Sequence, residues 1–205
     1  MESLGLKANL KVPFMYWTAK MHKIPTSARF ITSAIGSTLE PLSKLVCTSL
    51  SSLIKIKKNH SLFNHKKTGF NKYFVVDNRH PLTIFMDKDN GNDKPKTINT
   101  YGFEALYTSI PQQKLKDAIA LFVKSIFKLK NKGFISISNT NSWLTRAKSD
   151  KVTSFSSNDF INCIFYLTEN SYVCFQDILY RQVIGIPMGI RGRSHSLKFK
   201  IVIKY

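Results

Sequence analysis

Cysteines, carboxylates and long apolar runs are all scarce in this chain of 205 residues. The three cysteines, Cys47, Cys163 and Cys174, are scattered and no two have CxxC spacing, which argues against a disulfide framework or a zinc site. No apolar run is long enough to span a bilayer, and the first residues lack the apolar core of a secretory signal. We therefore expect an intracellular protein, in the nucleus or the cytoplasm, with reduced thiols and no membrane partner.

The scarcity of carboxylates leaves a large positive charge. Thirty-one Lys and Arg residues against twelve Asp and Glu residues give a formal net charge of +19. Such an excess promotes contact with phosphate backbones through counterion release, and an anionic membrane surface is a more distant alternative. Charge alone does not establish nucleic-acid binding, because a basic face can simply be solvated.

Apolar residues make up 43% of the chain, enough for a packed core. Their spacing and the turn residues between them predict strands and long helices, in an order that suggests an α+β architecture. The expected elements are a strand at 29–34, a helix capped by Ser37 or Thr38 and apolar through Ile54, a strand and turn at 97–110, a helix from Pro111 to a stop at Gly133, a helix from Ser156 or Ser157, and a hairpin of 172–175 with 178–184.

Three polar stretches invite functional interpretations. Residues 55–72 are rich in Lys, His and Asn, and we favour a solvated loop there over a nucleic-acid contact. The lysines near the end of the helix that Pro111 opens suit the helix dipole without any partner. Residues 87–97 contain three aspartates, but lysines interrupt them and the later glutamate of a calcium loop is absent, so we expect no metal there.

Three segments carry a more specific signal. They are AKMHK at 19–23 followed by RFITS at 29–33, TYGFEALYTSIP at 100–111, and YRQVIGIPMG at 180–189. In this order they resemble the reverse transcriptases of Penelope-like retroelements, over approximately residues 13–189. The LYTSIP and QVIGIPMG strings are much more specific than the first segment.

The resemblance implies part of a right-hand polymerase. Residues 1–189 would form a partial reverse transcriptase domain, with fingers at about 11–96 and an incomplete palm at about 97–189. The thumb would be absent, and residues 190–205 would be a basic tail unrelated to the family. Intact relatives are expected to use two Mg²⁺ ions, an RNA or DNA template-primer and deoxynucleotides, because two metals can clamp the attacking and leaving oxygens of nucleotidyl transfer.

The resemblance also assigns roles to single residues. Lys20, Lys23 and Arg29 become candidates for the phosphates of the nucleotide, Arg29 foremost because a guanidinium can hold phosphate oxygens bidentately. The two lysines are equally well explained as ordinary surface cations. Tyr107 would stand beside the nucleotide sugar and exclude a 2′ hydroxyl, although core packing would also explain an aromatic residue there.

The last string would shape a loop under the template and nucleotide. The residues concerned are Gln182, Gly185, Pro187, Met188 and Gly189. Glycines would permit a close backbone approach that a Cβ would obstruct. A plain strand-ending turn is the alternative.

Two departures from the family predict that this chain is catalytically inactive. Gly102 occupies the position expected for the first metal-binding aspartate, and Glu104 would lie roughly 6–7 Å along the strand, too far to replace it. No Asp or Glu follows Asp177, so the expected paired aspartates are missing. We therefore expect an inactive reverse transcriptase fragment that binds no metal productively. The alternatives are a non-catalytic basic RNA- or DNA-binding fragment and a product with no biological role.

Overall fold

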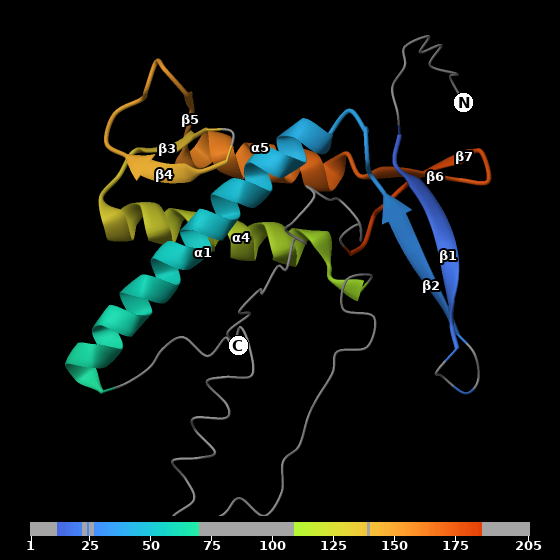
Figure 1. Ribbon diagram of the computed structural model, residues 1–205, viewed down its shortest axis with the longest axis horizontal. Coiled ribbons are helices and arrows are strands. Elements are labelled where there is room, and N and C mark those ends of the chain that lie inside the picture. The colour runs from blue at the N-terminus through green and yellow to red at the C-terminus, as the bar shows by residue number, and fades with distance from the viewer. Residues whose placement is uncertain (1–11, 22–23, 25–26, 70–108, 139, 186–205) are drawn as a thin grey trace, which may run out of the picture.

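The structure is a computed structural model and describes residues 12–21, 24, 27–69, 109–138 and 140–185. Within those residues it is a mixed α and β structure, drawn in Figure 1. The elements in chain order are β1 (Phe14–Lys20), β2 (Ser27–Ser33), α1 (Glu40–Thr68), α4 (Gln112–Lys130), β3 (Phe134–Ile137), β4 (Ser142–Thr145), β5 (Thr153–Ser156), α5 (Ser157–Glu169), β6 (Tyr172–Phe175) and β7 (Ile178–Arg181). The assignment to a partial polymerase stays a prediction.

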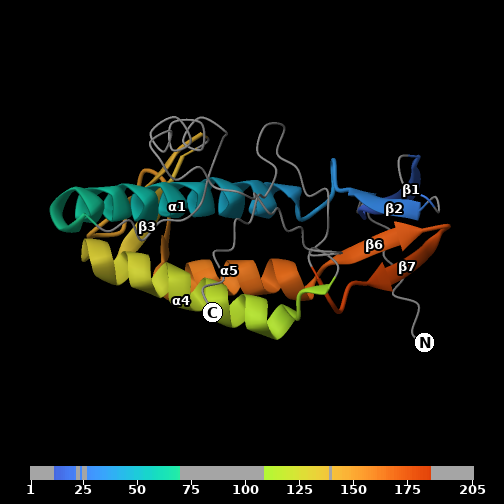
Figure 2. The ribbon, with the colours of Figure 1, turned by 90° about the horizontal axis from the view of Figure 1, so that it is seen from below.

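The hydrophobic core lies where the three helices meet the sheet of β3, β4 and β5. Figure 2 shows α1 on one side of the helical part of the molecule and α4 and α5 on the other. The helices contribute their apolar stripes, and β3 adds two isoleucines. The buried cluster consists of Val46, Leu50, Leu53, Ile110, Leu115, Ile119, Val123, Ile126, Phe127, Ile135, Ile137, Phe160, Ile161 and Ile164. The helical spacing of these residues in the sequence is therefore the spacing of one buried face.

The small sheet has the order β4-β3-β5, and both pairings are antiparallel. Ser136 on the central strand is fully buried, and its hydroxyl is 2.9 Å from that of Ser154 and 3.2 Å from that of Thr145. These bonds satisfy a polar group that would otherwise destabilise the interior. The sequence pattern did not predict these strands, because polar residues occupy most of the segment between α4 and α5.

A second sheet lies at the other end of the molecule, with strand order β2-β1-β6-β7 (Figure 1). β1 and β2 pair antiparallel along their whole length, and β6 joins β1 in parallel through Phe14 and Cys174. The expected hairpin of β6 and β7 is confirmed, with Gln176 and Asp177 at positive φ in the turn. The last strand ends at Arg181, earlier than Ile184.

The prediction of a loop beginning at Lys55 is wrong, because α1 continues to Thr68. Lysine is a good helix former, and no glycine or proline interrupts the chain between Leu42 and Thr68. Gly69 ends the helix with φ of 71°, a left-handed conformation that glycine adopts without strain.

Two expected helix ends are also corrected. Leu39, and neither Ser37 nor Thr38, is the N-cap of α1, where the Glu40 carboxylate instead accepts a hydrogen bond from the Gly36 N–H. At the end of α4, Asn131 adopts the left-handed conformation in place of Gly133. Gly133 instead allows close approach to β4, since a Cβ there would lie 3.1 Å from the Arg146 carbonyl oxygen. The predicted starts at Pro111, which is the N-cap of α4, and at Ser156, the N-cap of α5, are confirmed.

No helix among the described residues is both long and apolar enough to cross a membrane.

Candidate functional site at the junction of two motif segments

The ends of the two more specific strings meet in the structure. Ile110 and Pro111 close the first string, and Gln182 and Gly185 belong to the second. The Gly185 N–H donates to the Ile110 carbonyl oxygen at 2.8 Å. This backbone bond joins positions that are far apart in the sequence, two residues before α4 and four residues after β7.

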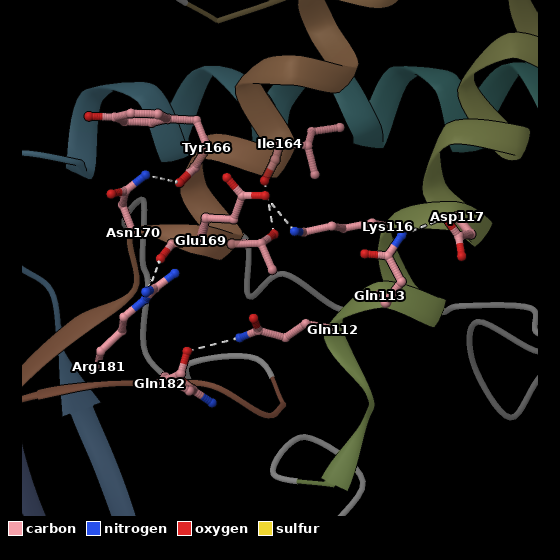
Figure 3. Close-up of polar contacts among 11 residues, drawn as sticks. Gln112, Gln113, Lys116, Asp117, Ile164, Tyr166, Glu169, Asn170, Arg181 and Gln182 are labelled. Atoms are coloured by element: carbon pink, nitrogen blue, oxygen red, sulfur yellow. Dashed lines mark hydrogen bonds and ion pairs between the residues drawn. The ribbon is translucent and has the colours of Figure 1, made fainter.

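Gln112, the first residue of α4, reinforces this contact (Figure 3). Its side-chain Nε2 donates to the Gln182 carbonyl oxygen at 3.0 Å and lies 3.5 Å from that of Gly185. A single amide group therefore connects the start of α4 to both ends of the segment 182–185. We call Ile110, Pro111, Gln112 and residues 182–185 the motif junction.

The segment 182–185 is held by its own hydrogen bonds as well. The Gln182 N–H donates to the Ser171 carbonyl oxygen at 2.8 Å, and its side-chain Nε2 donates to the Ile184 carbonyl oxygen at 3.0 Å. Gly185 is buried and has φ of 78°, in the region that favours glycine. The backbone conformation at position 185 therefore favours glycine.

A charged contact braces α4 against the end of α5 (Figure 3). The Lys116 ammonium lies 2.6 Å from the Glu169 carboxylate, and the Arg181 Nε donates to the Glu169 carbonyl oxygen at 3.1 Å. The hydrogen bond that Lys116 donates lowers the pKa of Glu169 below 4.5, and the positive charge of Lys116 contributes less to the same shift. The Lys116 side chain is only 12% exposed, so this contact helps to fix the helix that carries Gln112.

The first motif segment forms the hairpin of β1 and β2. In this hairpin Thr18 pairs with Arg29, and Lys20 pairs with Ser27. The backbone positions of Lys20 and Arg29 therefore lie on neighbouring strands, offset by two residues. The hairpin belongs to the same sheet as β7, which leads into the motif junction. The two predicted phosphate contacts therefore share a sheet with the strand that leads to Gln182.

Several predicted site residues lie outside the described residues. They are Lys23, Gly102, Glu104, Tyr107, Pro187, Met188 and Gly189. The segments 87–97 and 190–205 lie outside them as well, as does most of the strand expected at 97–110. The fingers and palm boundaries, the metal position and the sugar gate consequently remain predictions.

Within the described ranges, no group of three or more His, Cys, Asp or Glu side chains lies close enough together to hold a metal ion. The three cysteines, all within the described residues, form no disulfide. Burial raises the pKa of the Cys47 and Cys163 thiols, the latter also through the negative charge of Asp159. A raised pKa disfavours the thiolate, so neither thiol has the environment of an activated nucleophile.

A small apolar pocket of about 180 Å³ borders the motif junction. Ala34, Leu39, Leu167 and Val173 help to line it, and Gln182 lies at its edge. Its lining comes in part from the turn before α1 and from the end of α5.

Sequence reasoning missed Gln112 and the ion pair of Lys116 with Glu169. Gln112 follows the LYTSIP string directly, so its place beside a motif was available as a signal. Lys116 and Glu169 are separated by 53 residues and belong to no motif. Only the packing of α4 against α5 brings them together.

Comparison with known proteins finds no matching protein-family model, no matching curated protein and no matching solved structure.

Proposed function

We propose that this chain carries part of a reverse transcriptase, related to those of Penelope-like retroelements, that retains a nucleotide- and template-facing junction and lacks catalytic activity. The observation that carries the proposal is the pairing of Gly185 with Ile110, reinforced by Gln112. This contact brings together the two strings that carry the resemblance, although they are far apart in the sequence. Their meeting supports the proposal, because by the resemblance both strings would belong to one palm.

The chemistry of the proposed site is binding without transfer. Arg29, with Lys20 and Lys23, would neutralise the triphosphate, while Tyr107 would exclude ribonucleotides by contact with the 2′ hydroxyl. Gln182, Gly185, Pro187, Met188 and Gly189 would support the template and nucleotide. Gly102 offers no oxygen ligand, so the two-Mg²⁺ mechanism of intact relatives lacks a required carboxylate. We expect the chain to work in the nucleus or the cytoplasm with RNA or DNA as partner.

Nucleotide binding tests the ancestry independently of catalysis. We expect Arg29→Ala to weaken binding of a fluorescent deoxynucleoside triphosphate about tenfold, because a charge-assisted bidentate contact is lost. The matched control is Lys114→Ala, which removes a cation from the exposed side of α4 and should leave binding unchanged. Equal effects of the two variants would contradict a nucleotide site at the hairpin.

Two further measurements test the gate and the inactivity. Tyr107→Val should increase ribonucleotide binding relative to deoxynucleotide binding. Primer extension on a homopolymer template with Mg²⁺ or Mn²⁺ should yield no product. Template-dependent synthesis by the purified chain would refute the inactive assignment while leaving the ancestry intact.

A further inference from the structure

The end of the molecule opposite the motif junction carries an uneven share of the charge. The C-terminal ends of α1 and α4 and the sheet of β3, β4 and β5 lie on the same side of the molecule in Figure 1 and Figure 2, and in Figure 1 the end of α1 extends past α4, away from the small sheet. We call the cations of these segments the basic end. They are Lys55, Lys57, Lys58, Lys66, Lys67, Lys124, Lys128, Lys130, Lys132, Arg146, Lys148 and Lys151. Within 55–68 and the described part of 124–151, Asp150 is the one carboxylate that accompanies these twelve cations.

Tertiary structure creates this surface. Lysines of α1 and lysines of α4 are far apart in the sequence, and α1 would contribute few of them if it ended near Ile54. The ion pairs of Lys44 with Glu40 and of Lys116 with Glu169 both lie outside the basic end. Most cations of the basic end are exposed, so their positive potential faces solvent.

The surface is hollowed as well as charged. One hollow is lined by Lys148, Lys151 and Asp150, with hydroxyl groups from Ser138 and Thr140. A second is lined by Lys132 and Arg146, with the Asn131 amide beside them. Each hollow combines cations with neutral hydrogen-bond donors, a combination that suits phosphate and sugar oxygens.

Exposed aromatic rings accompany the cations. Trp143 on β4 is 43% exposed, and Phe63 on α1 is 57% exposed with the Lys67 ammonium 4.5 Å from its ring centre. Exposed rings among cations are the combination that binds single strands, because unpaired bases stack on aromatic faces while the backbone meets positive charge. An anionic lipid surface would also meet the exposed cations, so binding to vesicles is measured beside binding to nucleic acid.

We propose that the basic end is a second binding surface, separate from the motif junction, for the backbone and bases of single-stranded RNA or DNA. The surface goes beyond the proposed polymerase site, because none of its residues belongs to the three motif segments. It would operate whether or not the motif junction holds a nucleotide.

A pair of charge-matched variants of the full chain tests this proposal by fluorescence anisotropy with labelled 20-nucleotide RNA and DNA homopolymers. Lys128→Gln with Lys148→Gln removes two cations from the basic end. Lys44→Gln with Lys114→Gln removes two from elsewhere on the helices. Because each phosphate contact contributes about 0.7 to the slope of log affinity against log salt on single strands, the first pair should lower that slope by about 1.4 and the second should leave it nearly unchanged.

A location readout completes the experiment. Trp17→Phe leaves Trp143 as the single tryptophan, and bound single strands should then quench its fluorescence. Equal losses from both double variants, binding that ignores salt, or unchanged Trp143 fluorescence would each overturn the proposal. Binding to phosphatidylserine vesicles in place of nucleic acid would overturn it too. Loss of nucleotide binding in Arg29→Ala leaves this proposal standing, so the two proposals fail separately.

Discussion

The two ends of the molecule differ in what they bury. The buried cluster lies among α1, α4, α5 and β3, towards the basic end. Among the described residues, none of the strands β1, β2, β6 and β7 contributes a side chain to it. That sheet instead exposes large apolar side chains, including Trp17 at 61% and Phe30 at 49%. The difference teaches that the sheet carrying the first and third motif segments contributes little to the hydrophobic core, which Ile110 of the motif junction joins from the second segment.

The charges divide in a similar way. Near the motif junction the Glu169 carboxylate is paired with Lys116, while the basic end has cations in large excess. Paired charges fix local geometry and contribute little net field. Cations in excess create a field that reaches an approaching anion. The ion pair near the motif junction thus holds local geometry, while the basic end presents a positive field to solvent.

The largest expected effect comes from the core. Phe160→Ala removes a fully buried ring from α5 and should lower the free energy of unfolding by about 3–5 kcal/mol. Leu179→Ala, on the exposed strand β7, should change it by less than about 0.5 kcal/mol. Urea denaturation followed by circular dichroism measures both. If Phe160→Ala does not fold, Ile126→Val should still cost about 0.5–1.5 kcal/mol.

The two tryptophans sharpen this comparison, because Trp17 reports on the motif-bearing sheet and Trp143 on the core region. In single-tryptophan variants, Trp17 fluorescence should change at a lower urea concentration than Trp143 fluorescence. Coincident transitions would show that both ends unfold as one cooperative unit, contrary to the separation inferred here.

The next largest effect concerns the motif junction. Gln112→Ala removes the donor to the Gln182 and Gly185 carbonyl oxygens, at a cost of about 1–3 kcal/mol to the local structure. Hydrogen exchange of the Gly185 amide should accelerate accordingly, because opening the junction releases its bond to Ile110. Gln113→Ala, one residue away, is the control, since that side chain bonds to Asp117 on its own helix. Unchanged Gly185 protection in Gln112→Ala would contradict the positioning role.

A smaller effect is expected at the start of α5, the helix that runs from the core sheet to the β6–β7 hairpin. The Ser156 hydroxyl accepts from the Asp159 N–H at 3.2 Å, and the Asp159 carboxylate accepts from the Ser156 N–H at 3.3 Å. Ser156→Ala should cost about 1 kcal/mol, and Ser157→Ala, inside the helix, almost nothing. Thermal unfolding of the two variants measures the difference, and equal melting temperatures would contradict the capping box.

The smallest effect is the pH dependence of the Glu169 contact. The pKa of Glu169 is lower in the folded protein than its ordinary 4.5, mainly through the hydrogen bond from Lys116. Its stabilisation is therefore complete above pH 4.5 and is lost as the pH falls through the lowered folded-state pKa. Glu169→Gln should be less stable than the natural chain at pH 7, and this deficit should be smaller at pH 3, where more of the Glu169 carboxyl is protonated. Urea titrations at both pH values give the comparison, with Asp177→Asn in the exposed hairpin turn as control. A deficit that is as large at pH 3 as at pH 7 would assign the effect to packing.

Local sequence determined much of the helical framework. Apolar residues three and four apart fixed the buried faces of α4 and α5, and Pro111 and Ser156 marked their starts because their chemistry suits a helix entrance. The β6–β7 hairpin was predictable from two short apolar runs around a polar pair. The motif strings also singled out Gln182 and Gly185, two residues of the motif junction.

Tertiary structure decided the rest. The charge of residues 55–68 suggested a loop, yet packing of the preceding turns allowed one helix to continue through them. The strands β3, β4 and β5 were not predicted, because polar residues occupy much of them. Pairing of the strands lets Ser136 share hydrogen bonds with Ser154 and Thr145, which a local pattern does not reveal. The pairing of Gly185 with Ile110 and the gathering of α1 and α4 lysines at one end join distant parts of the chain. No local pattern encodes such contacts, because their energy comes from partners that the folded backbone brings together.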